Sequence, residues 1–202
     1  MKAKLILLSA LFCVLVVGVI SIILIINYNG IVFVDNNVEE AKGEIANMYQ
    51  RRLDLIPNLV ETVKGYAAHE RDTLEAVINA RNQAKMVLDG ISKKGALSTE
   101  DIKQLEESQV ALTSSIRGIF ALVENYPDLK AASNFMMLQD QLEGTENRIA
   151  VSRTRYNSVV KVYNSKITMF PGVIIAPLFG YDKKEFFKVQ NEEVSQAVKV
   201  TF

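Results

Sequence analysis

Cysteine, histidine and tryptophan are scarce in this 202-residue chain, which has one cysteine, one histidine and no tryptophan. A single cysteine allows no disulfide framework, and one histidine cannot provide the clustered ligands of a structural zinc site. The ten glycines are spread singly along the chain, so no glycine-rich phosphate-binding loop is present. We therefore expect no metal ion, no cofactor and no nucleotide chemistry.

An excess of charge of either sign is also missing. The chain has 23 lysines and arginines against 23 aspartates and glutamates, which gives a net charge of zero. This balance argues against a strongly basic nucleic-acid-binding protein, and we expect no nucleic-acid partner. Hydrophobic residues make up 49% of the chain, which excludes a disordered polypeptide.

The apolar residues are concentrated near the N-terminus. Between residues 5 and 26, 19 of 22 residues are apolar. A helix of this length rises about 33 Å, enough to cross a hydrocarbon core of about 30 Å. A cleaved signal peptide has an apolar core of about 7 to 15 residues followed by a small-residue cleavage site, and neither feature fits. We predict an uncleaved transmembrane helix, with residues 1–4 as a short tail and 27–34 as a connector.

Lysine and arginine positions indicate the orientation of this predicted anchor. Lys2 and Lys4 precede the span, whereas the first charged residues after it are mainly acidic, beginning with Asp35. The side of the membrane with more lysine and arginine is generally the cytoplasmic side. We therefore expect the short tail in the cytoplasm and the large domain outside it.

Residues 35–167 carry the periodicity of amphipathic helices. Apolar residues recur at steps of three and four from Ile45 through Ala67, and the pattern continues to Leu88. Pro57 lies inside this pattern and should kink a helix, and Gly65 is a candidate break. The first stretch is therefore either one kinked helix or two helices.

Two further helices follow. Ser98 and Asp101 form a capping-box pattern that predicts a helix start, and Pro127 predicts that this helix ends near Asn125. Another periodic stretch predicts a last long helix over residues 128–167. No comparable alternating pattern supports a sheet, so we predict an all-α fold with an antiparallel helical bundle.

The C-terminal tail, residues 168–202, differs in character. Residues 167–179 carry no charge and are interrupted by prolines, so they are too short and broken for a second span. This segment, which includes Phe170 and Phe179, either inserts at the membrane interface, contacts a neighbouring subunit or folds back over the bundle, and we favour the third. Within the remainder, the sequence predicts a helix cap at 182–185 that displays two phenylalanines, and a short extended segment through the alternating residues Val198, Val200 and Phe202.

Several motifs, taken in order, resemble the LemA family of bacterial membrane-anchored proteins. They cover roughly residues 27–187 and comprise 27–29 (NYN), 51–61 (RRLDLIPNLVE), 63–67 (VKGYA), 69–70 (HE), 80–81 (AR), 122–130 (LVENYPDLK), 146–150 (ENRIA), 156–157 (YN), 163–164 (YN), 170–171 (FP) and 179–180 (FG). One departure is Lys42, where the family often carries a tryptophan.

The resemblance implies a four-helix, up-and-down-like bundle on one membrane anchor of a bacterial cytoplasmic membrane. With the lysine bias, this would place the bundle on the periplasmic or extracellular side. LemA-like proteins have no established catalytic activity and no agreed ligand. The family includes a magnetosome-membrane relative and frequently accompanies a membrane zinc metalloprotease, so another membrane protein is a candidate partner.

A charged cluster surrounds the predicted kink. Arg51, Arg52 and Asp54 beside Pro57 either form a partner-binding recess, because a kinked helix frees a backbone carbonyl, or make salt bridges between helices. A lone histidine is a poor transition-metal site, so we favour a capping or surface role for the pair His69–Glu70. The candidate interaction surface also includes Glu61, His69 and Glu70.

A tyrosine–asparagine pair occurs twice in the last predicted helix. Tyr156–Asn157 and Tyr163–Asn164 are seven residues apart and therefore share one helix face. Tyrosine offers a large contact area with a polar tip, so this face either lines an interface between copies or packs in the core.

These features predict a single-pass, membrane-anchored helical scaffold that self-associates into a homo-oligomer, and not an enzyme. The main alternative is an adaptor or regulator of another membrane protein, such as a membrane protease. A third possibility is an enzyme that uses glutamate and arginine side chains near Pro57. Replacing Arg52, Asp54 and Glu61 would test this alternative, because an enzyme would lose function while keeping its stability and assembly.

Overall fold

The computed structural model describes residues 2–95 and 97–187, and within them it contains helices and no strand, which confirms the all-α prediction. The predicted extended segment at Val198, Val200 and Phe202 lies outside the described residues. The helices of the described part are α1 (Lys2–Lys64), α2 (Arg71–Ser92), α3 (Thr99–Val123), α4 (Pro127–Lys130), α5 (Ser133–Thr168) and α6 (Gly172–Leu178).

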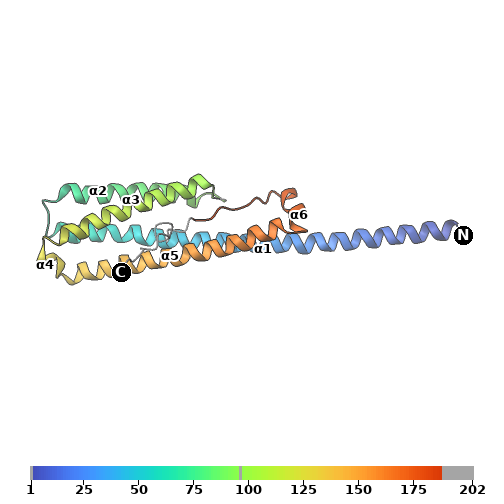
Figure 1. Cartoon of the computed structure of the whole chain (residues 1–202), viewed down its shortest axis with the longest axis horizontal. Helices are drawn as coiled ribbons and strands as arrows, with labels where there is room; N and C mark the ends of the chain where they lie inside the picture. Colours follow the sequence, from blue (N-terminus) through green and yellow to red (C-terminus); the bar gives the residue numbers. More distant parts are fainter. Residues whose placement is uncertain (1, 96, 188–202) are drawn as a thin grey trace, which may run out of the picture.

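Helix α1 joins the apolar N-terminal run to the bundle in one uninterrupted helix of 63 residues. Residues 27–34, predicted as a connector, are helical. The N-terminal part projects alone from the bundle (Figure 1). It is long and apolar enough to cross a membrane, and its apolar stretch is not buried against the rest of the chain.

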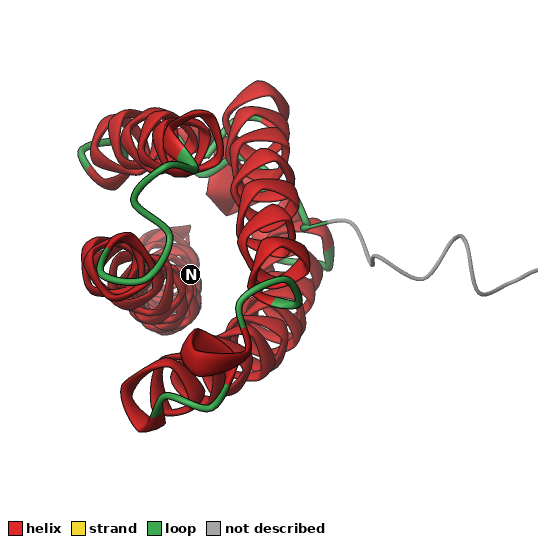
Figure 2. Ribbon diagram, turned by 90° about the vertical axis from the view of Figure 1, so that its left-hand side faces the viewer, coloured by secondary structure: helices red, strands yellow, loops and turns green. Residues whose placement is uncertain are grey.

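The C-terminal part of α1 forms an antiparallel bundle with α2, α3 and α5 (Figure 1). Viewed along the long direction of the molecule, these helices lie around a common axis and not in a flat layer (Figure 2). Helix α1 packs mainly against α5 and α2, and α2 packs against α3. Fully buried side chains from the long helices include Leu53, Val63, Val77, Leu112 and Val160. The apolar stripes read from the sequence therefore face one shared core.

Two predicted helix boundaries are confirmed. Helix α1 passes through Pro57 and ends at Lys64, directly before Gly65, so the first periodic stretch forms two helices. At the start of α3, Ser98 Oγ accepts a hydrogen bond from Asp101 N at 3.1 Å, and Asp101 Oδ2 accepts one from Ser98 N at 3.0 Å. This reciprocal pair is the predicted capping box.

The predicted helix over residues 128–167 is broken near its start, which corrects the prediction. Pro127 opens the four-residue helix α4, as its preference for a first helical turn suggests. Ala132 then has an extended backbone (φ −69°, ψ 125°), and α5 begins at the next residue. The physical reason is the corner: the chain reverses from α3 to α5 here, and Leu129 of α4 is fully buried at this turn.

After α5 the tail turns back along the bundle, while Phe170 and Phe179 of its apolar part stay exposed. Helix α6 packs against α1 and α5, and residues 181–187 then run as a drawn-out segment without helix or strand (Figure 1). The helix cap predicted at 182–185 is therefore wrong. The backbone of this segment is held by side chains of α5, which replaces the hydrogen bonds of a helix.

Candidate functional site

The most specific arrangement of polar groups holds the chain's own residues 181–187, called here the strap, against α5 and α1. The two tyrosine–asparagine pairs of α5 lie on the same helix face, two turns apart. Tyr156 and Tyr163 are buried, whereas Asn157 and Asn164 are half-buried and reach the strap. Of the two alternatives for this face, an interface between copies or packing in the core, the burial of both tyrosines matches the second.

Each asparagine binds both backbone groups of one strap residue. Asn157 Nδ2 donates to Phe187 O at 2.8 Å, and its Oδ1 accepts from Phe187 N at 2.9 Å. Asn164 makes the same pair of bonds to Lys184, at 2.8 and 2.9 Å. A side-chain amide has the donor and acceptor of a peptide group, so each asparagine binds the strap as a neighbouring strand would. This mode of binding recognises an extended backbone and does not depend on the side chains.

Lys184 adds a side-chain contact to this backbone recognition. Its Nζ lies 2.6 Å from Asp35 Oδ1 and 3.3 Å from Glu39 Oε1, both on α1, and 5.0 Å from the centre of the Tyr163 ring. The Tyr163 hydroxyl donates to Asp182 O at 2.9 Å, and burial raises the pKa of this hydroxyl to about 12. Tyr163 therefore stays a neutral donor at physiological pH.

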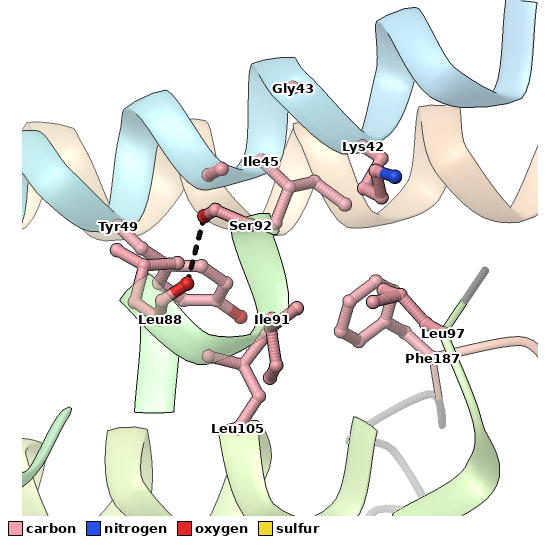
Figure 3. A pocket seen from close by; sticks show the side chains of 11 residues that line it. Lys42, Gly43, Ile45, Tyr49, Leu88, Ile91, Ser92, Leu97, Leu105 and Phe187 are labelled. Atoms are coloured by element: carbon pink, nitrogen blue, oxygen red, sulfur yellow. Dashed lines mark hydrogen bonds between the residues drawn. The ribbon is translucent and has the colours of Figure 1, made fainter. Parts of the chain in front are cut away.

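Phe187 provides the second side-chain contact. Its ring is buried, lies edge-on to Tyr156 with the ring centres 5.1 Å apart, and has the Arg153 guanidinium 5.3 Å from its centre. It also closes one side of an apolar cavity of about 100 Å³ between α1, α2 and α3 (Figure 3). The other apolar side chains lining this cavity include Ile45, Tyr49, Leu88, Ile91, Leu97 and Leu105.

Lys42, the position where LemA-like sequences often have tryptophan, lines the same cavity. Its Nζ donates to Lys94 O at 2.9 Å and to Gly95 O at 2.7 Å, and it pairs with Glu39. The ammonium group thus pairs with two carbonyls just past the end of α2 and ties α1 to the α2–α3 connection.

Arg52 is turned into the bundle and does not line an open recess. Its side chain is only 6% exposed, and its Nη1 lies 3.0 Å from Glu146 Oε2 on α5. Its Nη2 donates to Thr113 Oγ1 on α3 at 2.7 Å. Burial lowers its pKa, and the Glu146 carboxylate opposes this shift. Arg52 therefore joins three helices, which matches the salt-bridge alternative for this cluster.

The other charged residues of the cluster point elsewhere. Arg51 and Asp54 are exposed, and Asp54 accepts a hydrogen bond from Gln50 within α1. Glu61 is also exposed and pairs with Lys64 of the same helix. Arg52, Asp54 and Glu61, the residues of the enzyme alternative, are therefore not brought together in one site.

Pro57 leaves the carbonyl of Leu53 without its helical donor, because proline has no N–H. This carbonyl, which the sequence predicted to be free, accepts a hydrogen bond from Arg81 of α2: the distance from Arg81 Nε to Leu53 O is 3.4 Å. Sequence reasoning placed Arg81 in a family motif without assigning it this contact. The contact depends on the packing of α2 against α1, which periodicity alone does not provide.

His69 and Glu70 lie in the connection between α1 and α2. His69 is exposed, and Glu70 accepts a hydrogen bond from the Tyr126 hydroxyl at 2.8 Å. This bond links the α1–α2 connection to the corner before α4. Among the described residues, no group of three histidine, cysteine, aspartate or glutamate side chains is arranged to hold a metal ion.

The two tail phenylalanines lie on either side of α6. Phe170 is 80% exposed, and Phe179 is 57% exposed with its ring centre 4.7 Å from that of Tyr28 on α1. The sequence analysis missed Lys184 and the buried position of Phe187, and the repeated asparagines of α5 are the signal that could have indicated the strap contacts.

Taken together, the fold defines a class of proteins in which an antiparallel four-helix bundle continues into one apolar helix long enough to cross a membrane. The LemA family profile matches residues 41–202, and the chain belongs to the LemA family. The resemblance inferred from the motifs is thus confirmed.

Named relatives are similar over most of their length. Magnetosome protein MamQ 2 of Paramagnetospirillum magneticum is 26% identical over 195 residues, covering 89% of this chain and 72% of the relative. Protein LemA of Metamycoplasma hominis is 25% identical over 162 residues, covering 79% and 68%. Magnetosome protein MamQ of Magnetospirillum gryphiswaldense is 24% identical over 178 residues, covering 81% and 65%.

Proposed function

We propose that this protein is a single-pass scaffold of a bacterial cytoplasmic membrane, which holds its bundle outside the cytoplasm and self-associates there. The observation that carries the proposal is the continuity of α1, which runs from the exposed apolar segment into the bundle core. A continuous helix has no flexible linker, so it holds a bundle at a set distance from the bilayer. The lysines before the span and the acidic residues after it support the orientation.

Self-association is supported by the outer face of α5. Val151, Thr154 and Ser158 are exposed, uncharged and lie along a shallow depression of the surface. Arg155 beside them points toward α1, where it contacts Glu40 and Glu44. Weak contacts of this kind gain from confinement to a membrane plane, because neighbouring copies share a surface and their effective concentration rises.

The test is the mass and shape of the full-length protein in mild detergent, by light scattering on a sizing column and electron microscopy of the peak. We expect discrete particles of many identical chains, and we expect Val151→Glu to reduce their size. Val110→Glu, at an exposed valine on α3, is the matched control and should leave the particles unchanged. A monomer for the unmodified chain would overturn the self-association proposal.

The second candidate is an adaptor that holds an extended segment of another membrane protein, such as a membrane protease. It is supported by the asparagine contacts to Lys184 and Phe187, because they bind backbone and would accept another extended segment equally well. Phe187→Ala should weaken the strap and increase recovery of a membrane partner at fixed ratio, whereas Phe186→Ala, at an exposed position, should not. Equal recovery with both variants would argue against the adaptor.

A further inference from the structure

The surface of α6 and the turn before it is unusually apolar for an exposed part of a protein. From residue 167 to residue 181 the chain has no charged side chain. Ile175 and Ala176 face the bundle and are buried. The exposed apolar side chains of this segment, called here the α6 patch, are Met169 (66%), Phe170 (80%), Val173 (48%), Ile174 (58%), Leu178 (73%) and Phe179 (57%).

The position of the α6 patch along α1 indicates what covers it. The ring of Phe179 contacts Tyr28, and the side chain of Lys166, at the end of α5, lies against Gly30 of α1. Tyr28 comes two residues after Ile26, the last residue of the apolar run, which corresponds to about 3 Å along the helix axis. The α6 patch therefore lies at the level where the proposed span leaves the hydrocarbon core.

The direction of α6 fits the same location. In Figure 1 the short helix lies across α1 and α5, at the end of the bundle from which the apolar part of α1 projects. If α1 crosses the bilayer, a helix that lies across α1 runs along the membrane surface. Its outer apolar side chains then meet the boundary between headgroups and acyl chains, as in helices that lie in the membrane interface.

The flanking residues have the chemistry of that boundary. Tyr28, Phe179 and Tyr181 form an aromatic cluster, with ring centres of Tyr28 and Tyr181 6.3 Å apart. Tyrosine is enriched where a protein passes from hydrocarbon to headgroups. Charged residues resume on both sides of the uncharged segment, at Lys166 and at Asp182, where headgroups would surround them.

We propose that the α6 patch is a second membrane contact, which inserts into the interfacial layer of the leaflet that faces the bundle. The occupant is lipid and not another protein, because the patch continues the exposed apolar surface of α1, where Ile25 and Ile26 are 60% and 64% exposed. One helix through a bilayer leaves the bundle free to rotate and tilt, and a contact beside it restricts both motions. The inference rests on the membrane anchoring proposed above.

The chain has no tryptophan, so a single introduced tryptophan reports its own surroundings without background. The full-length protein is reconstituted in phosphatidylcholine vesicles, with and without lipids brominated at the headgroup end of the acyl chains. Phe170→Trp tests the α6 patch, and Leu178→Trp tests it at a second exposed position. Phe12→Trp reports the anchor, and Val151→Trp, an exposed position on the α5 surface of the bundle, reports the absence of lipid contact.

We expect brominated lipid to reduce the emission of Phe170→Trp, Leu178→Trp and Phe12→Trp by about twofold or more, and that of Val151→Trp hardly at all. Quenching of Phe12→Trp without quenching at either patch position would overturn the second contact and leave the anchor intact. A blue-shifted but unquenched emission at the patch would mean that protein covers it, and would also overturn the inference. Absence of quenching at Phe12→Trp would overturn the anchor and the second contact together.

Discussion

Arg52 illustrates how one buried charge organises the neighbouring helices. A buried guanidinium is stable only when its donors are paired, and Glu146 and Thr113 supply partners from α5 and α3. Gln109 Oε1 accepts a further, longer bond at 3.4 Å. The adjacent Arg51 has the same side chain on the outer surface of α1. A comparison of Arg51 with Arg52 therefore separates the effect of burial on stability from the effect of the residue type.

We predict that Arg52→Ala lowers the free energy of unfolding by about 2 kcal/mol, because buried polar groups on α3 lose their donor. Arg51→Ala should change it by less than about 0.5 kcal/mol, as surface substitutions usually do. Chemical denaturation of the full chain in detergent, followed by circular dichroism, measures both values. Equal effects would show that Arg52 is not an organising residue of the bundle.

Asp101 carries a pH dependence that can be worked out from its contacts. Its carboxylate accepts a hydrogen bond from Lys94 and another from the backbone of Ser98, and these hold the pKa of Asp101 below its ordinary value. The folded state thus binds a proton at this site less readily than the unfolded state does. The stabilisation is fully present above the unfolded pKa of about 3.9 and is lost as the pH falls through the folded pKa.

We predict that Asp101→Asn lowers the free energy of unfolding by about 1 kcal/mol at pH 7, as the loss of a helix cap does. The difference between the variant and the unmodified chain should shrink below about pH 4, where the unmodified Asp101 also becomes protonated. Denaturation curves between neutral and acid pH measure this. Asp140→Asn, at an exposed position on α5, is the control, and a pH-independent effect of Asp101→Asn would contradict the assignment.

At the scale of elements, the strap depends on α5 more than on its own sequence. Residues 182–185 have the pattern of a helix start, yet they form no helix. Two asparagines and a tyrosine of α5 take the backbone groups that a helix would pair internally. Lys184 and Phe187 then place their side chains against α1 and the cavity. Contacts distant in sequence thus override a local preference.

We predict that Asn157→Ala and Asn164→Ala each speed hydrogen exchange of the strap amides by about fivefold or more, because each variant removes two hydrogen bonds worth about 1 kcal/mol apiece. The amide of Phe187 should respond most to the first variant, and that of Lys184 to the second. Asn147→Ala, at an exposed position of the same helix, is the matched control. Strap amides that exchange equally in all three variants would contradict the asparagine contacts.

At the scale of the whole molecule, α1 determines the reach of the protein. The 38 residues from Asn27 to Lys64 continue the apolar run as one helix and rise about 57 Å. The α1–α2 connection, with His69, lies just past that end. The bundle is therefore as tall as this part of α1, with α6 at its base and His69 at its tip.

We predict that a dye at His69→Cys, in a chain that also carries Cys13→Ser, lies about 57 Å from the edge of the hydrocarbon core. Energy transfer to acceptor dyes on the lipid headgroups of reconstituted vesicles measures this distance. A dye at Asn36→Cys, near the base, is the control and should transfer far more strongly. Strong transfer from His69→Cys would mean that the bundle lies flat on the membrane.

The features that could be read from the sequence are those set by neighbouring residues. The apolar run, the stripes at steps of three and four, the break at Gly65 and the capping box at Ser98 each depend on residues within a few turns of one another. Backbone geometry makes these local rules general, so they transfer to any chain. The all-α class and the antiparallel bundle followed from them.

The features that required the folded chain are contacts between residues far apart in sequence. The corner at Ala132, the Arg81 contact with the carbonyl freed by Pro57, and the strap under Asn157 and Asn164 all depend on which helices become neighbours. Spacing placed the two asparagines on one face but did not name their partner. Local periodicity defines which side of each helix is buried, whereas the pairing of helices, and so the strap contacts and the α6 patch, depends on how all the buried sides pack at once.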